Sequence, residues 1–332
     1  MSTTKSQYWQ IIRGICILAV ILIHCASEVS YPWNGIDAHW YFIARNLINF
    51  PVAVFFFMSG RFCKEGKVLT KHRLCYLIIP YFVYSTIYIF TRMIFETTYT
   101  FVEIVKMYVF ATAAAPLYYI WVLVYYTLLT PFLWKYLCKI WLGIVIGCVS
   151  FVPLLIGYIC EFNGLFVWDY LKYTTIWLPF YYAGMLYQKK AVKIKEKKYA
   201  FLCLICAFTL QLVESYFMLR AQKYAIAYSQ MRVSGIIYAS AVILFLCSIE
   251  KEPINTRISK GFIAIGNNSY GIYYLHSLFL LFLSKMVLNR VSFSLVIVRP
   301  IELIFSLSMS LFTIYIIRLI FKKRLSKFIF GV

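Results

Sequence analysis

Long apolar runs recur along the whole sequence of 332 residues, and they restrict the fold more than any other feature. A helix needs about 20 mostly apolar residues to cross the hydrocarbon core of a bilayer. The runs predict an all-α polytopic membrane protein of about ten transmembrane helices. They form a single integral-membrane domain over residues 1–332, without an appended soluble domain. The predicted spans lie near residues 10–28, 40–60, 74–94, 117–134, 140–160, 174–188, 199–218, 233–249, 262–283 and 295–320.

The composition excludes a soluble fold. Hydrophobic residues make up 63% of the chain and charged residues only 14%, with a mean hydropathy of +0.78. Soluble domains average roughly 45–50% apolar residues and about 25% charged residues. A soluble chain of this length has too little interior to hide so much apolar surface, so lipid is the expected solvent.

The strong positive charge fits a membrane better than a nucleic acid. The formal net charge is +21, from 33 Lys and Arg residues against 12 Asp and Glu residues. These cations sit in short clusters between apolar runs, where they orient helices and attract anionic lipid. The N-terminus, the even-numbered loops and the C-terminal tail hold 21 of them, and the opposite loops hold 8. The excess predicts that both termini face the cytoplasm.

Three ionisable residues interrupt or follow the first predicted span. Arg13 and His24 are 11 residues apart, about three helical turns, so both point the same way roughly 16 Å apart along the axis. Glu28 lies one further turn along the same face, where its carboxylate can orient the imidazole. Because ionisable side chains are expensive inside a membrane, they are functional candidates by default. The alternative is a structural polar contact between helices.

The ninth predicted span carries a second histidine. His276 follows the run from Gly266, which includes Ser269 and Tyr273. Counted from the cytoplasmic end of its span, His276 lies about as deep as His24, at roughly 21 Å. Two imidazoles at similar depth can share one cavity, although helix tilt can also separate them.

A cationic group gathers at the cytoplasmic ends of the second and third spans. Its members are Arg61, Lys71, His72 and Arg73. One interpretation is ordinary positive-inside topology. The other is a dock for a phosphate-rich ligand, because arginine suits bidentate phosphate contacts.

These features together resemble acyltransferase family 3, the integral-membrane acyltransferases that include the O-antigen acetylases. The resemblance covers residues 9–276. It rests on Arg13-Gly14 followed by His24; Phe55-Phe-Phe-Met-Ser59-Gly60; Arg73 before Pro80-Tyr81; the aromatic stretch Leu117–Pro131 with Trp121; and Gly266, Ser269, Tyr270, Tyr273 and His276.

The resemblance implies transfer of an acyl group, usually acetyl from acetyl-CoA, to a hydroxyl of an extracytoplasmic or lipid-linked carbohydrate. It places the protein in a bacterial plasma membrane, with acyl-CoA, the saccharide and lipid as partners and no metal. On this interpretation His24 is the general base, His276 relays the proton and Glu28 holds the tautomer. Four cations are expected to bind the phosphates of the donor: Arg13, Arg61, Arg73 and Lys71.

A separate set of residues is expected to bind the acceptor. Ser269 and Tyr273 are candidate donors to a developing oxyanion. Trp121 offers a face for stacking a sugar, although aromatic belts at the interface explain such tryptophans equally well. A further polar set in the outer half is a candidate vestibule; its members are Arg45, Asn46, Asn49, Glu214, Arg299 and Glu302.

Two alternatives stay open at this point. Arg299 and Glu302 stand three residues apart, which favours a structural ion pair. A transporter or flippase for a lipid-linked saccharide would also explain buried charge without chemistry. Transporters usually contain paired repeats with broken helices, and the sequence has no such symmetry.

Overall fold

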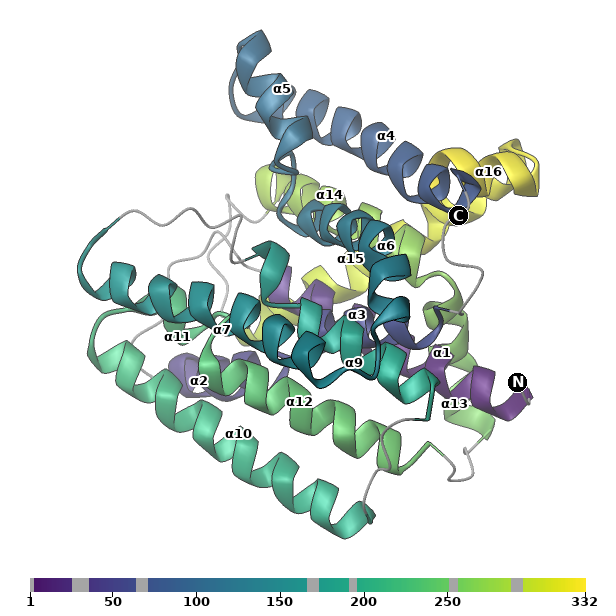
Figure 1. Ribbon diagram of the computed structural model, residues 1–332. Helices are drawn as coiled ribbons and strands as arrows, with labels where there is room; N and C mark the ends of the chain where they lie inside the picture. Colours follow the sequence, from purple (N-terminus) through teal and green to yellow (C-terminus); the bar gives the residue numbers. More distant parts are fainter. Residues whose placement is uncertain are drawn as a thin grey trace. The chain divides into compact units, whose positions relative to one another are not determined.

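A computed structural model describes residues 3–25, 36–63, 71–165, 173–190, 196–250, 256–287 and 295–332 (Figure 1). Within these ranges the secondary structure is helical and no strand occurs. The chain divides into two compact units, each described by itself. Unit 1 holds residues 1–9, 38–68 and 129–259, and unit 2 holds residues 10–37, 69–128 and 260–332.

Unit 1 is built from helices that pack against one another in pairs. In Figure 1, α10 runs alongside α12, and α3 lies against α9. Its elements are α2 (Ile36–Leu47), α3 (Pro51–Arg61), the end of α6 (Tyr118–Lys135), α7 (Ile140–Phe162), α9 (Leu178–Gln188), α10 (Lys197–Arg220), α11 (Tyr224–Ala227) and α12 (Val233–Ser248).

Glycines bring α3 and α9 into close contact. A Cβ atom on Gly60 would come within 3.0 Å of the carbonyl oxygen of Tyr181, and one on Gly184 would come equally close to that of Phe57. Only glycine therefore fits at these two positions. Small residues at helix interfaces allow this close backbone approach in membrane proteins.

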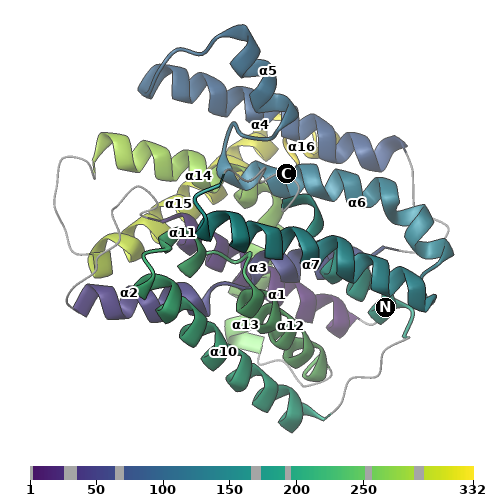
Figure 2. The ribbon, with the colours of Figure 1, turned by 60° about the vertical axis from the view of Figure 1, so that its left-hand side comes forward.

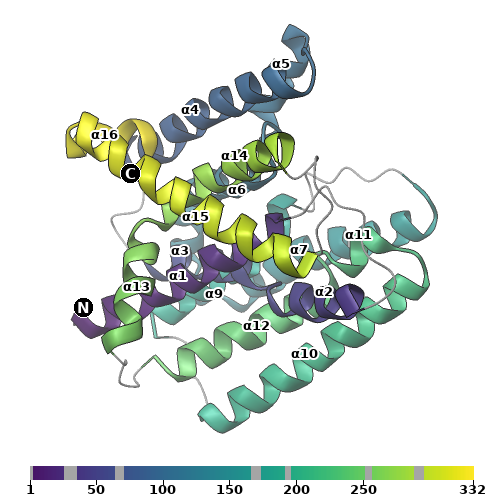
Figure 3. The ribbon, with the colours of Figure 1, turned by 180° about the vertical axis from the view of Figure 1, so that it is seen from behind.

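Unit 2 contains the rest of the helices. Its pairs α14 with α15 and α4 with α16 lie side by side in Figures 2 and 3. Its elements are α1 (Thr3–His24) from Gln10 onward, α4 (Lys71–Phe95), α5 (Phe101–Val109), the 3-10 helix η1 (Ala115–Leu117), α6 up to Leu128, α13 (Thr256–Asn267) from Lys260 onward, α14 (Ser269–Met286), α15 (Leu295–Ile320) and α16 (Lys323–Phe330).

A second glycine pair joins α1 to α13 in unit 2. A Cβ atom on Gly14 would press on the carbonyl oxygen of Phe262, and one on Gly266 would press on that of Gln10. The close approach fixes the start of α1 against the end of α13. It therefore fixes the position of Arg13, which precedes Gly14.

Among the described residues, seven helical segments are long and apolar enough to cross a membrane. They are Gln7–His24, His39–Arg61, Leu74–Phe95, Ala115–Lys135, Ile140–Phe162, Lys197–Arg220 and Ile297–Ile320. The prediction of an all-helical membrane protein is confirmed by these helices, whereas the count of ten and the cytoplasmic termini stay predictions.

The other three predicted spans differ from full-length helices. Near 174–188, α9 has only 11 residues, and near 233–249, α12 has 16. The run 262–283 is divided between α13 and α14 at Asn268. There the Asn268 side-chain amide donates to the Ala264 carbonyl oxygen at 2.8 Å. Asparagine competes in this way with the helical backbone, which explains the break.

Candidate functional site

The two membrane histidines of unit 2 lie side by side. His24 ends α1 and His276 stands in the middle of α14, and their ring centroids are 5.4 Å apart with planes tilted by 49°. His276 is fully buried and His24 is half-buried. The contact confirms that two imidazoles from distant parts of the sequence share one location. Their catalytic roles stay predictions.

Hydrogen bonds hold the His276 ring and its backbone. The ring Nδ1 lies 3.1 Å from the Ile272 carbonyl oxygen, and Nε2 lies 3.2 Å from the Ser277 hydroxyl. With Nδ1–H donating to the carbonyl, Nε2 is unprotonated and accepts from Ser277. The Ser306 hydroxyl of α15 donates to the His276 carbonyl oxygen at 2.9 Å. The ring is thus oriented from its own helix, and α15 holds its backbone.

Tyr273 packs beside the histidines. Its ring centroid is 5.8 Å from that of His276 and 5.3 Å from that of Tyr119. Its hydroxyl donates to the Pro116 carbonyl oxygen, so its proton is already engaged. Ser269 is buried at the start of α14. The assignment of Tyr273 and Ser269 as oxyanion donors is still a prediction.

Arg13 lies on α1 three turns before His24. Its side chain is half-buried. Tyr119, from the start of α6, packs on Tyr273, with ring centroids 5.3 Å apart. The donor-binding role of Arg13 stays a prediction.

Some of the predicted site residues lie outside the described part of the chain. Glu28 lies outside the described residues, and Lys71 and Arg73 belong to the first turn of α4 with side chains outside the description. Trp121 is half-buried and stacks on Tyr81, with centroids 5.3 Å apart. Tyr81 therefore covers one face of the indole that was assigned to sugar stacking.

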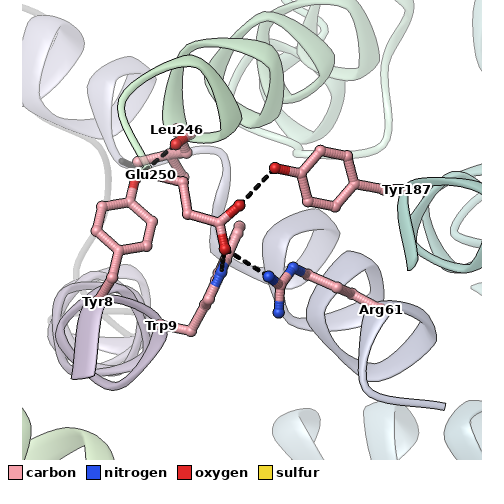
Figure 4. Close-up of polar contacts among 6 residues, drawn as sticks. All are labelled: Tyr8, Trp9, Arg61, Tyr187, Leu246 and Glu250. Atoms are coloured by element: carbon pink, nitrogen blue, oxygen red, sulfur yellow. Dashed lines mark hydrogen bonds and ion pairs between the residues drawn. The ribbon is translucent and has the colours of Figure 1, made fainter. Parts of the chain in front are cut away.

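Arg61 lies in a buried cluster of unit 1 (Figure 4), which we call the Arg61–Glu250 cluster. Its Nη2 lies 2.5 Å from Glu250 Oε1, with both side chains at most 5% exposed. The guanidinium also stacks on Trp9, 4.6 Å from the ring centroid. The ion pair neutralises Arg61, so a phosphate contact there would have to displace or rearrange Glu250.

The other members of the cluster saturate the carboxylate. The Trp9 indole N–H donates to Glu250 Oε1 at 2.8 Å, and the Tyr187 hydroxyl donates to Oε2 at 2.5 Å. The Tyr8 hydroxyl donates to the Leu246 carbonyl oxygen at 2.6 Å (Figure 4). The sequence analysis missed Glu250, because an acid beside Lys251 at the end of an apolar run has the pattern of an ordinary loop charge.

The polar residues of the second span form a separate network in unit 1. Asn46 is fully buried, and its side-chain amide donates to the Phe42 carbonyl oxygen at 2.8 Å. The backbone carbonyl oxygen of Asn46 accepts from Gln211 Nε2 at 2.6 Å. Arg232, also fully buried, donates to the Asn46 side chain. Arg232 was counted as a loop cation, and nothing in the local sequence distinguishes it from one.

Three other members of the predicted vestibule, Arg45, Asn49 and Glu214, also form hydrogen bonds within unit 1. Arg45 donates to the Asn49 side chain four residues on. Glu214 accepts from the Tyr158 hydroxyl and, at 2.8 Å, from the Ser234 backbone N–H. The described part of the chain thus brings the polar residues of α2 and α10 into one unit. Their binding of an acceptor stays a prediction.

One comparison with known proteins matches nearly the whole chain. A family model described as an acyltransferase domain matches residues 6–319. No curated protein and no solved structure matches the chain. Among the described residues, no group of three or more His, Cys, Asp or Glu side chains is arranged to hold a metal ion.

Proposed function

Because this chain belongs to acyltransferase family 3 and is a membrane acyltransferase, we propose that it moves an acetyl group from a cytoplasmic acyl-CoA to a carbohydrate hydroxyl. The acceptor is an extracytoplasmic or lipid-linked saccharide. The observation that carries the proposal is the pair of imidazoles His24 and His276, 5.4 Å apart. Imidazole is the side chain best suited to take and return a proton near neutral pH.

The chemistry needs one base and no covalent enzyme intermediate. The acceptor hydroxyl oxygen attacks the thioester carbonyl carbon while His24 takes the hydroxyl proton. A tetrahedral intermediate forms, and its carbon–sulfur bond then breaks. The thiolate of CoA leaves and receives the proton from His24, which returns the imidazole to its neutral form. The products are an O-acyl ester and free CoA thiol, so atoms and charge balance.

His276 contributes through its position beside the base. Its buried ring, held by Ile272 and Ser277, provides a fixed dipole next to His24 and a route for relaying the proton. For Tyr273 to serve the oxyanion, its hydroxyl has to exchange the Pro116 carbonyl oxygen for the substrate oxygen.

The donor enters from the side where the N-terminal half of α1 lies. CoA carries phosphates and does not cross a bilayer, and the excess of basic residues supports a cytoplasmic N-terminus. Arg13, near that end of α1, is then suited to a charge-assisted phosphate contact. The acyl group extends from there toward His24, roughly 16 Å along the helix axis.

Inverted membrane vesicles test the proposal directly, because they present the cytoplasmic face to the medium. Vesicles with and without the protein are supplied with acetyl-CoA labelled in the acetyl group, and label is measured in the saccharide fraction. We expect protein-dependent, base-labile label from inverted vesicles and little from right-side-out vesicles. A saccharide that crosses the membrane without gaining label would contradict the proposal and favour the transporter alternative.

A further inference from the structure

One buried stripe along α15 contains a carboxylate. Every fourth residue of the helix is buried, from Val298 through Glu302, Ser306 and Ser310 to Ile314. Residues between them, such as Ile304 at 64% exposed, face outward as expected for lipid contact. Glu302 is 3% exposed on this stripe. A buried carboxylate in a membrane-spanning helix is a functional candidate, because its burial is expensive.

The stripe meets α14 at the histidine pair. Ser306 donates to the His276 carbonyl oxygen at 2.9 Å. Glu302 stands one turn before Ser306 on the same buried stripe, about 6 Å along the axis. The face of α15 that carries Glu302 is thus held on α14 at His276, whose ring lies 5.4 Å from that of His24.

A structural ion pair with Arg299, three residues before Glu302, is the alternative. Such a pair would hold α15 to itself and would not depend on the histidines. A carboxylate close to the two imidazoles would instead stabilise any imidazolium that forms.

We propose that Glu302 is a positioning residue for His24, holding its ring and offsetting the positive charge it acquires with the acceptor proton. Buried carboxylates play this part beside catalytic histidines in unrelated enzymes. In this scheme Glu302 takes no proton, and the proton stays on His24 until the thiolate takes it. The inference rests on the proposed acyl transfer. It assigns to α15 the carboxylate role that the sequence analysis predicted for Glu28.

The test is Glu302→Gln, which keeps the shape and hydrogen bonding of the side chain and removes its charge. We expect kcat/KM for transfer to fall by between about 10-fold and 10⁴-fold, as when the orienting carboxylate of a catalytic histidine is lost. Affinity for acetyl-CoA and thermal stability in detergent should stay at wild-type values. Ser310→Ala, two turns farther along the same stripe, is the matched control and should transfer normally.

The pH profile separates a positioning role from a structural one. Within the described ranges, the titratable and charged groups around this point include His24 and Cys25 of the α1 end, Tyr273 and His276 of α14, and Arg299 and Glu302 of α15. Loss of the carboxylate makes the His24 imidazolium less stable, so the acid limb of kcat/KM should move to lower pH. Glu302→Asp keeps the charge and should retain the wild-type acid limb at a reduced rate.

The outcomes are distinguishable. If wild-type protein transfers nothing, the proposed function fails. If wild type transfers and folded Glu302→Gln has the wild-type rate and acid limb, the positioning role is overturned while the acyltransferase stands. Should Glu302→Gln not accumulate as folded protein, Glu302→Asp decides: a reduced rate with an unmoved acid limb supports the inference, and a wild-type rate overturns it.

Discussion

The Arg61–Glu250 cluster of unit 1 and the histidine pair of unit 2 are built on opposite principles. In the Arg61–Glu250 cluster of unit 1, the charges cancel and both carboxylate oxygens accept hydrogen bonds. In unit 2, His24 and His276 are two imidazoles in ring contact, and imidazole is a side chain that can both take and return a proton. A satisfied ion pair is suited to holding helix ends together, whereas paired imidazoles are suited to proton transfer. Burial of an ionisable group therefore does not by itself locate the chemistry.

The largest effect is expected from His24→Gln. A general base cannot be replaced by an amide, and its loss typically costs about 10²–10⁴-fold in rate. The variant should keep wild-type expression, thermal stability and acyl-CoA affinity, because glutamine preserves hydrogen bonding. Transfer of labelled acetyl into cell-surface carbohydrate, at matched protein levels, measures the loss. His276→Gln should be impaired to a smaller extent.

His39→Gln is the matched control for this measurement, because His39 is an exposed histidine of α2. It should transfer at the wild-type rate. Wild-type transfer by His24→Gln would remove the distinction between the two clusters and end the assignment of the base.

The next effect concerns the stability of unit 1. Arg61→Met alone leaves Glu250 buried without its counter-ion and should cost about 3–5 kcal/mol. The double variant Arg61→Met, Glu250→Leu removes both charges and should recover most of that stability. Thermal unfolding in detergent compares the two. Equal destabilisation by the single and double variants would contradict a structural ion pair.

The same double variant tests the predicted role of Arg61 toward the donor. Once stability is recovered, any remaining loss of acyl-CoA affinity has to come from the missing guanidinium. Unchanged acyl-CoA affinity in this variant would mean that Arg61 stabilises the fold and does not bind the donor.

Arg13→Ala should weaken acyl-CoA binding at least tenfold, because a charge-assisted hydrogen bond is worth about 1.5–3 kcal/mol. Arg13→Lys should restore only part of the affinity, since a point charge replaces a planar fork. Binding of acetyl-CoA to detergent-purified protein measures both. An Arg13→Ala protein that binds as wild type does would move the donor away from α1.

A smaller effect tests how α1 is held in unit 2. Gly266→Ala forces its new Cβ onto the Gln10 carbonyl oxygen, whereas Gly261→Ala on the same helix meets open space. Overpacking of this kind costs roughly 1–3 kcal/mol. We expect a lower unfolding temperature for Gly266→Ala and an unchanged one for Gly261→Ala. Similar melting of the two variants would show that the close approach of α1 and α13 is not needed.

The sequence predicted the helical membrane class and placed the two histidines at similar depth, which allowed them to meet. It succeeded there because hydropathy determines span positions, and depth along each span follows from helix rise. It missed Glu250 and Arg232, whose positions at helix ends look like topological charges. It also predicted one span over 262–283, where Asn268 breaks the helix. Local hydropathy carries no information about which distant charge will meet which.

Photolabelling tests the central comparison most directly. Acyl-CoA with a photoreactive group at the end of its acyl chain is irradiated with the folded protein, and the labelled peptides are identified by mass spectrometry. The account predicts label in unit 2, on the peptides of α1 and α14 that contain His24 and His276, and its loss when excess acetyl-CoA competes. Competable label confined to α3 and α9 around the Arg61–Glu250 cluster would contradict it.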